Sequence, residues 1–268
     1  MARLPKATPG SRRISPRMPS GPSEEAFLAS YDPTKFERLS VAVDVALLAL
    51  DPSIGFMSLL VRRDAHPAKG AWSLPGTFVR PRESLDEAAK RVLRDKAETE
   101  DVYVEQLYTF GALDRDPRTR VISVAYYALI QRELMLQLVT PPTVDVGRVH
   151  EPFAIRIRGS QVELAFDHGE MLQTAILRVR GKLDYSPIGY ELLGDRFTLF
   201  ELQQLHETIL GRKLNKDSFR RRMLASGQIE PTGELKERAV VLGGSAPATM
   251  ELGRPAELYR AAPPPRPG

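Results

Sequence analysis

Residues 72–99, WSLPGTFVRPRESLDEAAKRVLRDKAET, predict a loop followed by an amphipathic helix. Pro75 and Gly76 mark a turn, because proline fixes φ and glycine tolerates positive φ. Ser84 and Glu87 have the spacing of a capping box, in which the serine begins the helix and the glutamate reaches back to it. One face of the predicted helix is apolar, and it consists of Leu85, Ala88, Ala89, Val92 and Leu93.

This loop and helix resemble the Nudix box, G-x5-E-x7-R-E-U-x-E-E-x-G-U, where U is a bulky aliphatic residue. Glu83, Arg91 and Leu93 match the first glutamate, the arginine and the aliphatic residue. Thr77 and Glu98 replace the two glycines. In Nudix hydrolases the acidic positions hold Mg²⁺ against a pyrophosphate, and Mg²⁺ requires several oxygen ligands.

The chain departs from the box at acidic positions that this chemistry needs. Val92 and Lys96 stand at two of them and share a helix face, because they are four residues apart. Valine offers no metal ligand, and lysine places an ammonium group where a metal would bind. We therefore expect the fold to be kept and the hydrolase to be lost, with no catalytic residues and no metal site. Glu83 and Asp95 holding one metal ion is the alternative.

Composition and charge bound the protein further. The chain has 268 residues, of which 42% are hydrophobic and 27% charged, as in globular proteins. It has no apolar run long enough for a membrane span or a secretion signal. The absence of cysteine excludes disulfides, thiolate nucleophiles and cysteine-based zinc sites. We expect a cytoplasmic protein without membrane contact.

The N-terminal segment carries more positive charge than the whole chain, whose net charge is +4. Its first 20 residues contain no acid, and their basic residues are Arg3, Lys6, Arg12, Arg13 and Arg17. Because proline, serine and glycine dominate residues 1–22, we expect residues 1–35 to form a disordered basic tail and lead-in. Such a tail is either simply solvated or an arm that touches nucleic-acid phosphates.

Residues 36–183 have the pattern of an α+β domain. Strands are expected at 39–50, 56–61, 102–110, 121–130 and 153–158, with the rest of 135–160 unassigned or a long loop. Asp167 is expected to cap a helix at 167–182, and His168 is interpreted as a capping or packing residue. Strands before and after the box helix predict an α/β/α sandwich with a mixed sheet.

Residues 196–260 follow a linker, 184–195, and have a different pattern. Thr198 and Glu201 form a second capping box, and Gly211 ends the helix that they open. A second helix, 216–226, is capped by Asn215 or Asp217. Segments 229–232 and 238–242 around a turn at Gly233, and a further strand at 256–259, predict a wing. We expect a winged helix-turn-helix, with residues 261–268 disordered.

The second of these helices and the wing are rich in cations. Arginine can pair with guanine edges, and both arginine and lysine can neutralise phosphates, so the cluster of basic residues predicts DNA binding. The alternative is a solvated charged face. The candidate DNA-binding residues are Arg212, Lys213, Asn215, Lys216, Ser218, Arg220, Arg221, Arg222, Thr232, Lys236 and Arg238.

Several segments of residues 36–260 resemble the NrtR family of Nudix-related bacterial repressors. They are WSLPGTFVRPRESLDEAA, DRDPRTRVISVAYYAL, AFDHGEML, RFTLFELQQLHETILGRKLNKDSFRRRMLASGQIEPTG and RPAELYR. The resemblance implies a repressor of NAD-metabolism genes and a homodimer on a palindromic operator. It also implies an ADP-ribose-type effector that releases DNA, with no cofactor required.

A nucleotide diphosphate is bound by cations and backbone N–H groups, and adenine by aromatic or guanidinium faces. The candidate ligand-binding residues near the box are Arg63, Trp72, Gly76, Phe78, Arg80, Glu83, Arg115 and Arg118. Each arginine could instead be an ordinary surface residue, and each aromatic a core residue. The rival functions are an active Nudix hydrolase of ADP-ribose-like substrates with an accessory C-terminal domain, and an RNA-binding or structural module.

Overall fold

The computed structural model describes residues 23–97, 102–150, 153–183, 186–241 and 250–262. Residues 1–22 and 263–268, which were expected to be disordered, lie outside these ranges, whereas Ala261, the first residue of the predicted disordered tail 261–268, is the last residue of a strand. The chain up to Arg38 forms a unit of its own, which contains α1 (Glu24–Ser30) and the short 3-10 helix η1 (Pro33–Lys35). The prediction of a disordered lead-in is therefore wrong for residues 23–35, because Ser23 caps α1 and Asp32 caps η1.

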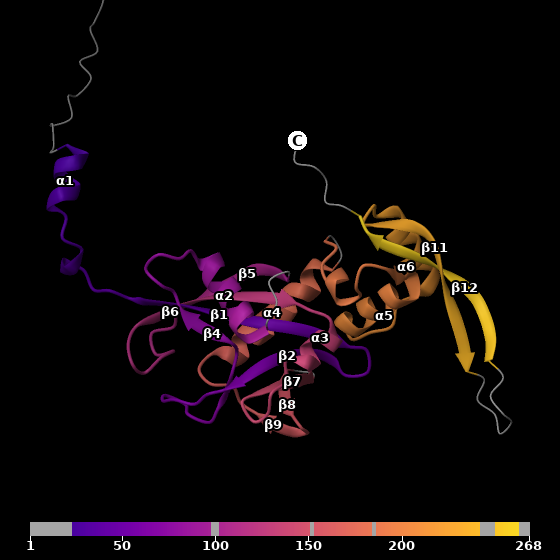
Figure 1. Cartoon of the computed structure of the whole chain (residues 1–268), viewed down its shortest axis with the longest axis horizontal. Helices are drawn as coiled ribbons and strands as arrows, with labels where there is room; N and C mark the ends of the chain where they lie inside the picture. The colour runs from indigo at the N-terminus through magenta and orange to yellow at the C-terminus, as the bar shows by residue number, and fades with distance from the viewer. Residues whose placement is uncertain (1–22, 98–101, 151–152, 184–185, 242–249, 263–268) are drawn as a thin grey trace, which may run out of the picture. The chain divides into compact units, whose positions relative to one another are not determined.

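The second unit contains a mixed sheet with β1 (Ser40–Asp51) in its middle, as Figure 1 shows. The strand order is β5-β6-β1-β2-β7-β8-β9, and among the strand pairs of the described residues β1 and β6 alone run parallel. Short β3 (Trp72–Ser73) pairs with β2, and β4 (Gly76–Phe78) pairs with β1. The other strands are β2 (Gly55–Arg62), β5 (Tyr103–Phe110), β6 (Val121–Leu129), β7 (Val144–His150), β8 (Ala154–Ile157) and β9 (Ser160–Val162).

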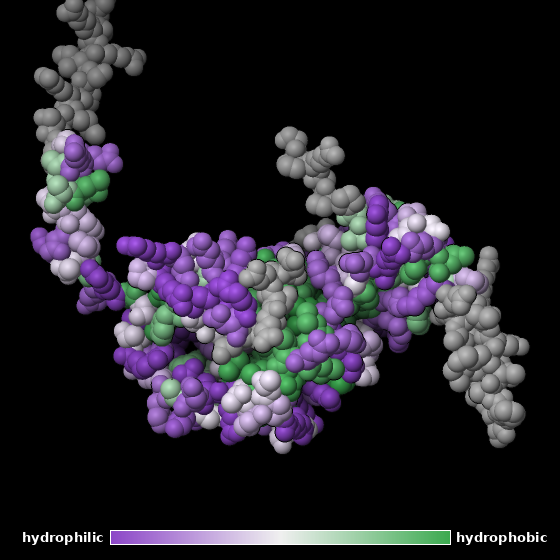
Figure 2. Space-filling view, viewed as in Figure 1, coloured by the Kyte–Doolittle hydropathy of each residue, from purple (hydrophilic) through white to green (hydrophobic). Residues whose placement is uncertain are grey.

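Helices cover both faces of this sheet, and β1 contributes side chains to both in alternation. Val45 and Leu47 pack toward α2 (Leu85–Ala97) and α3 (Arg132–Gln137), whereas Ala46 and Leu48 pack toward α4 (His168–Lys182). Hydrophilic residues dominate the surface around α2 in Figure 2, since the apolar face of that helix is turned inward. The predicted α+β sandwich with a mixed sheet is confirmed.

The box helix begins as predicted. The hydroxyl of Ser84 accepts a hydrogen bond from the backbone N–H of Glu87 at 3.2 Å, and the Glu87 carboxylate accepts one from the N–H of Ser84 at 2.7 Å. Residues 88, 89, 92 and 93 are buried against the sheet. Local signals were sufficient here, because the cap and the apolar stripe lie within ten residues of each other.

Two expectations in the first domain were incomplete or wrong. Residues 135–160 do not form a long loop, because they contain the end of α3 and a full strand, β7, paired with β2. Asp167 occupies the cap position of α4, but its side chain makes no capping hydrogen bond. Its carboxylate is held instead by Arg115, 52 residues away, so a long-range ion pair outcompetes the local cap.

The C-terminal elements form the predicted helices and a three-stranded sheet of order β10-β12-β11. Thr198 and Glu201 make the complete capping box of α5, and Gly211 ends that helix with a φ of 67°. Asn215 caps α6 through its side chain. The elements are η2 (Tyr190–Leu192), β10 (Phe197–Thr198), α5 (Leu199–Leu210), α6 (Lys216–Ala225), β11 (Ile229–Val241) and β12 (Met250–Ala261).

The predicted wing hairpin is wrong about which segments pair. Segments 229–232 and 238–242 do not face each other, because 229–241 is one strand, β11, that pairs with β12. Gly233, with a φ of 77°, lies where the pairing register shifts, so the glycine marks a β-bulge rather than a turn. The predicted linker also differs, because Ile188 and Tyr190 are buried.

A single apolar core joins the sheet domain to the winged helix. Leu48 of β1, Ile176 of α4 and Ile209 of α5 belong to one buried cluster, together with Phe219 of α6. Arg180, near the end of α4, donates from Nε to the carbonyl of Ile209 at 2.8 Å. The two domains therefore share their packing.

Shared packing predicts that a cavity made in α5 destabilises the sheet domain. Ile209→Ala should lower the free energy of unfolding by about 2–5 kcal/mol, because Ile209 is fully buried. Trp72, the one tryptophan, packs against the same cluster, and its fluorescence reports the sheet domain. Urea unfolding followed by this fluorescence should shift with Ile209→Ala, and Leu136→Ala on the exposed side of α3 is the control. An unchanged tryptophan transition would show that the domains unfold independently.

Candidate ligand cavity and DNA interface

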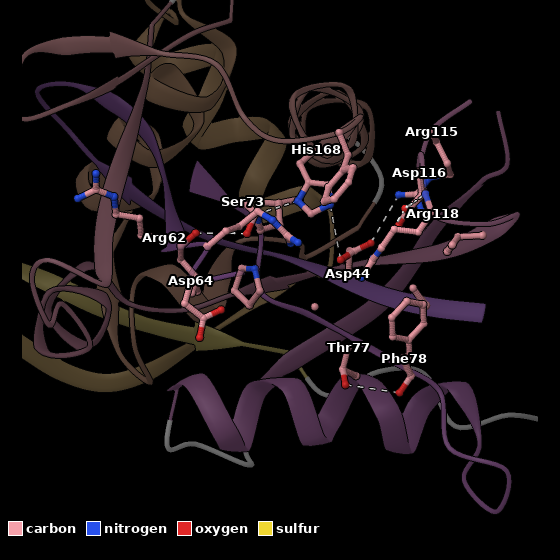
Figure 3. Close-up of a pocket in the computed structure, with 18 of the residues that line it drawn as sticks. Asp44, Arg62, Asp64, Ser73, Thr77, Phe78, Arg115, Asp116, Arg118 and His168 are labelled. Carbon is pink, nitrogen blue, oxygen red and sulfur yellow. Dashed lines mark hydrogen bonds and ion pairs between the residues drawn. The ribbon is translucent and has the colours of Figure 1, made fainter. Parts of the chain in front are cut away.

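A cavity of about 570 Å³ opens beside the box loop, at the edge of the sheet domain (Figure 3). Its walls come from the end of β2, the turn at 73–78, the loop before β6 and the start of α4. The polar and aromatic side chains that line it are Asp44, Arg62, Arg63, Asp64, Ser73, Thr77, Phe78, Arg115, Asp116, Arg118, Thr143, Phe166 and His168.

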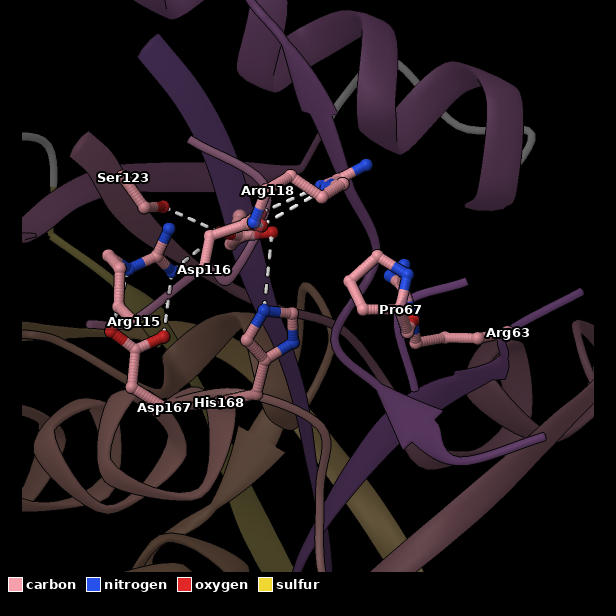
Figure 4. A network of polar contacts seen from close by, with 9 residues as sticks. Arg63, Pro67, Arg115, Asp116, Arg118, Ser123, Asp167 and His168 are labelled. Carbon is pink, nitrogen blue, oxygen red and sulfur yellow. Dashed lines mark hydrogen bonds and ion pairs between the residues drawn. The ribbon is translucent and has the colours of Figure 1, made fainter. Parts of the chain in front are cut away.

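A buried ionic network forms the inner wall of this cavity (Figure 4). Arg115 donates two hydrogen bonds to Asp167, at 2.8 and 2.7 Å, and its guanidinium lies 3.8 Å from Asp44. Ser123 donates to Asp44 at 2.5 Å. Because the Arg115 side chain is only 5% exposed, it depends on these acids for compensation. The network ties β1, β6 and α4 to one loop arginine.

His168 joins the turn to the start of α4. Its Nδ1 accepts the backbone N–H of Leu74 at 2.9 Å, so a neutral ring carries its proton on Nε2, 3.8 Å from an Asp44 oxygen. Burial lowers the pKa of His168, although Asp44 and Asp167 act to raise it. With Nδ1 acting as an acceptor, the neutral ring positions the turn against α4.

Gly76 is required by close packing against the same acid. A Cβ atom at this position would lie 1.9 Å from an Asp44 oxygen and 3.1 Å from the carbonyl of Val43. No side chain fits there without moving β1 or the acid. The glycine of the turn thus allows β4 to pair with β1 beside the cavity.

Two arginine–aromatic pairs lie on the cavity wall. The Arg63 guanidinium lies 4.7 Å from the ring centre of Phe166, and that of Arg118 lies 5.6 Å from Phe78. Phe166 has a φ of 56°, a strained value for a residue other than glycine. Asp116 accepts from the Arg118 side chain at 3.0 and 2.8 Å. These pairs offer cations and flat apolar faces within one cavity.

Five of the eight predicted ligand-binding residues line this cavity, and three do not. Arg63, Gly76, Phe78, Arg115 and Arg118 are in the wall. Trp72, predicted to bind the ligand, instead pairs with Arg62 in the sheet and packs against the shared core, and it is not part of the cavity wall. Arg80 is exposed and Glu83 is held by Arg91, and neither lines the cavity.

The sequence interpretation missed Asp44, Asp116 and Phe166, and gave His168 only a capping or packing role. Asp44 had a usable signal, because it is a charged residue inside an otherwise apolar predicted strand. The others lie 70 or more residues from Asp44 along the chain, and no local pattern brings them together. His168 is buried as expected, but it also lines the cavity.

Glu83 and Arg91 hold the box loop on the box helix. Arg91 donates to Glu83 at 3.0 and 2.5 Å, to the hydroxyl of Thr77 at 2.9 Å and to the carbonyl of Phe78 at 3.1 Å. The hydrogen bond from Arg91 lowers the pKa of Glu83 to about 2. Glu83 is thus an ionised carboxylate already engaged by a guanidinium.

Two other positions of the box, which are acidic in Nudix hydrolases, carry residues that do not supply a carboxylate to a metal ion. Val92 is 3% exposed and packs in the core between α2 and the sheet, and the side chain of Lys96 lies outside the described residues. Within the described ranges, no three histidine, aspartate or glutamate side chains are grouped closely enough to hold a metal ion.

All the predicted DNA-binding residues lie on the turn before α6, on α6 itself or on β11. On α6 the cations are exposed, whereas Phe219 and Met223 anchor the helix in the core. Asn215 is used as the helix cap, and the hydroxyl of Thr232 donates to the carbonyl of Leu258 at 2.9 Å. The side chain of Arg238 lies outside the described residues.

Lys213 and Lys236 each form an ion pair within the protein. Lys213 lies 2.8 Å from Glu207, and Lys236 lies 2.6 Å from Glu201. Arg222 stacks over the ring of Phe219 at 5.7 Å.

Within the described part of the chain no helix is long and apolar enough to cross a membrane.

Comparison with known proteins also divides the chain into a Nudix domain and a winged helix domain. Residues 189–241 match the NrtR DNA-binding winged helix domain, and residues 40–161 match the NUDIX domain. The chain is 35% identical over 240 residues to the ADPR responsive transcriptional repressor NtrR of Acinetobacter baylyi, covering 89% of this chain and 88% of that protein. The chain belongs to the NrtR family.

Solved structures agree with NrtR membership and with the fold. The crystal structure of Shewanella oneidensis NrtR complexed with a 27mer DNA is 32% identical, with a TM-score of 0.67, and the match covers 82% of this chain and 93% of that one. A MutT/nudix family protein from Enterococcus faecalis is 26% identical, with a TM-score of 0.69, covering 90% and 94%. This NrtR-family chain is therefore a DNA-binding transcriptional regulator with a Nudix-like domain.

The close approach at Gly76 predicts that this turn does not accept a methyl group. Gly76→Ala should destabilise the protein by about 1–3 kcal/mol, because the new Cβ overlaps Asp44. Gly169→Ala in α4 is the matched control, since nothing lies within 4 Å of its Cβ position. Alanine favours a helix, so that variant should be roughly 0.4–1 kcal/mol more stable. Chemical unfolding measures both, and equal stability of the two variants would contradict the packing.

The Glu83–Arg91 pair predicts an acid-dependent contribution to stability. The folded-state pKa of Glu83, about 2, lies below the ordinary 4.5, so its stabilisation is present above about pH 4.5 and is lost as the pH falls toward 2. Glu83→Gln should therefore differ most from the wild type above pH 4.5 and converge with it in acid. Urea unfolding across this range tests the prediction. In an Arg91→Met background the convergence should disappear, and its persistence would assign it to another partner.

Proposed function

We propose that this NrtR-family regulator represses NAD-metabolism genes and that its cavity binds ADP-ribose or a related nucleotide diphosphate as effector. The observation that carries the proposal is the cavity itself, where four arginines and two phenylalanine rings meet two buried acids, Asp44 and Asp116, and the exposed Asp64. The Acinetobacter relative responds to ADPR by name. The volume, about 570 Å³, is in the range of small-molecule sites.

The chemistry of the wall suits the parts of such a ligand. Arg63 and Arg118 present guanidinium groups that can hold a diphosphate. The rings of Phe78 and Phe166 offer faces on which adenine can stack. Carboxylates such as Asp64 and Asp116 can accept hydrogen bonds from ribose hydroxyls. The predicted site residues in this wall are thereby retained as ligand-binding residues.

The route from effector to DNA is proposed to pass through α4. Arg115 faces the cavity and holds Asp167 at the start of α4, and Arg180 near its other end holds the carbonyl of Ile209 in α5. A phosphate near Arg115 competes with Asp167 for the guanidinium. Freed Asp167 can then cap α4, which it does not do in this structure. Effector binding would thus favour a different placement of α4 and of the helices packed on it.

Sensing rather than turnover is proposed for the same cavity. Hydrolysis by the Nudix box needs carboxylates around Mg²⁺, and Val92 and Lys96 occupy two of those positions. A ligand that persists is also a better signal than one that is destroyed. The competing function is an active Nudix hydrolase with an accessory C-terminal domain.

The DNA partner is proposed to be a palindromic operator bound by a homodimer. Helix-turn-helix proteins present one recognition helix per half-site, so two-fold DNA sequences match two-fold proteins. The exposed cations of α6 and β11 would supply the contacts. We propose that the protein binds its operator in the cytoplasm.

A shift assay on the promoter beside this gene, with and without ADP-ribose, tests the proposal. The wild type should bind the duplex and release it when ADP-ribose is added. Arg118→Ala should weaken ADP-ribose binding about tenfold or more while leaving DNA binding without effector unchanged, because a charged hydrogen-bond donor is lost. Arg80→Ala, an exposed arginine outside the cavity, is the control.

Turnover is measured on the same samples. Release of ribose 5-phosphate from ADP-ribose with Mg²⁺ should stay at background. Steady turnover would favour the hydrolase. DNA binding that is unchanged when ADP-ribose is added would overturn the choice of effector.

A further inference from the structure

A second, larger groove of about 1020 Å³ lies on the winged helix, between the start of α5, the start of α6 and strands β11 and β12. Lys216, Arg220 and Lys236 place three cations along it, beside two carboxylates, Glu201 and Glu257, the second of which accepts a hydrogen bond from the hydroxyl of Tyr259 at 2.5 Å. Phe200 and Leu235, both exposed, give it apolar surface as well. Figure 2 shows hydrophilic and hydrophobic residues intermixed over this region. The ligand cavity does not share any of these residues.

The orientation of α6 separates its arginines into different directions. Phe219 and Met223 are buried, and each helical residue turns the side chain by about 100°. Arg221 therefore points almost directly away from the core, whereas Arg220 points to one flank, where it lines the groove with Lys216. The exposed face centred on Arg221 is free to enter a DNA groove.

Lys236 crosses the groove to Glu201, with 2.6 Å between Nζ and a carboxylate oxygen. The other oxygen of Glu201 completes the capping box of α5 with Thr198. Burial acts to raise the pKa of Glu201, but hydrogen bonds from Lys236 and Thr198 together lower it. Glu201 is thus an ionised acid that occupies one cation of the groove in the free protein.

We propose that this groove takes one phosphodiester strand of the operator duplex, that Lys236 exchanges Glu201 for a phosphate on binding, and that Arg221 contacts base edges. The inference rests on the DNA-binding function. Charge complementarity selects the occupant: three cations match successive phosphates, and the apolar surface can cover the sugars. An acidic protein segment would satisfy the cations but would leave the exposed Arg221 face unused.

The exchange makes Glu201 a competitor of DNA. Its carboxylate holds Lys236 in the free protein and repels the incoming phosphate strand. Glutamine at position 201 removes the charge and keeps the cap, because capping boxes accept glutamine. Glu201→Gln should therefore bind DNA more tightly. Removal of an acid outside the groove should have a smaller effect on DNA affinity.

The test measures affinity by fluorescence anisotropy for duplexes tiled across the promoter of this gene, at several salt concentrations. Glu201→Gln should tighten operator binding by about two- to fivefold, the range of an exposed ion pair. Glu234→Gln, another acid on β11 outside the groove lining, is the matched control and should tighten it less. Lys236→Ala should weaken binding and make the dependence of log K on log salt shallower by about 1.

Two further variants complete the design. Adding Glu201→Gln to Lys236→Ala should give a smaller gain than it gives in the wild type, because the carboxylate then has no cation to hold and only its repulsion of the phosphates is removed. Arg221→Ala should reduce discrimination between operator and a scrambled duplex by about 5- to 100-fold, whereas Arg220→Ala should weaken binding to both equally. Thermal unfolding of each variant shows that it is folded.

The outcomes separate the inference from the function on which it rests. A wild type that binds no promoter duplex would refute the DNA-binding function. A wild type that binds, with Glu201→Gln no tighter than Glu234→Gln or an unchanged salt slope for Lys236→Ala, would refute the groove. Tighter binding of Glu201→Gln to a polyglutamate peptide but not to DNA would assign the groove to an acidic protein partner instead.

Discussion

A guanidinium buried between two carboxylates holds the sheet domain of this protein together around its cavity. Arg115 is almost inaccessible to water, and it is stable there because Asp167 receives two hydrogen bonds and Asp44 lies 3.8 Å away. Removing one partner of such a network leaves an uncompensated buried charge, which costs about 3–5 kcal/mol. The partners come from β1, from the loop before β6 and from the start of α4, so the network fixes three segments at once. The turn at Gly76 closes on the same aspartate, and it leaves no space for a side chain.

This arrangement gives α4 a particular position between the two domains. Its 15 residues span about 22 Å at 1.5 Å per residue. At one end it meets the cavity through Asp167 and His168, and near the other it meets α5 through Arg180. Its buried face lies in the core that also contains α5 and α6. Because cores are close-packed, a shift of α4 cannot be absorbed locally and must move its neighbours. The structure thus shows continuous packing from the segment that Arg115 holds to the helices of the winged helix.

The parts that could be predicted from sequence are those governed by local interactions. Both capping boxes, the apolar stripe of the box helix, the cap of α6 and the glycine that ends α5 were correct, because each signal lies within a few residues of its effect. Long-range pairing was the source of the errors. Asp167 has the sequence position of a cap, yet Arg115 takes its side chain. Gly233 has the signature of a turn, but the strand continues through a bulge because β12 supplies the partner. The cavity was half predicted for the same reason: its arginines lie close to the box in sequence, whereas Asp44, Phe166 and His168 come from distant strands and helices.

The residues that the box keeps and those that it lacks have different structural roles. Glu83 and Arg91 are kept, and together they fix Thr77 and Phe78, which line the cavity. Val92 stands at an acidic position of the box, and it is buried in the core under α2, where a carboxylate would have to be desolvated. Restoring the acid at this position would thus first cost stability, whatever it did for metal binding. The retained pair shapes the wall of the cavity, and Val92 packs in the core behind it.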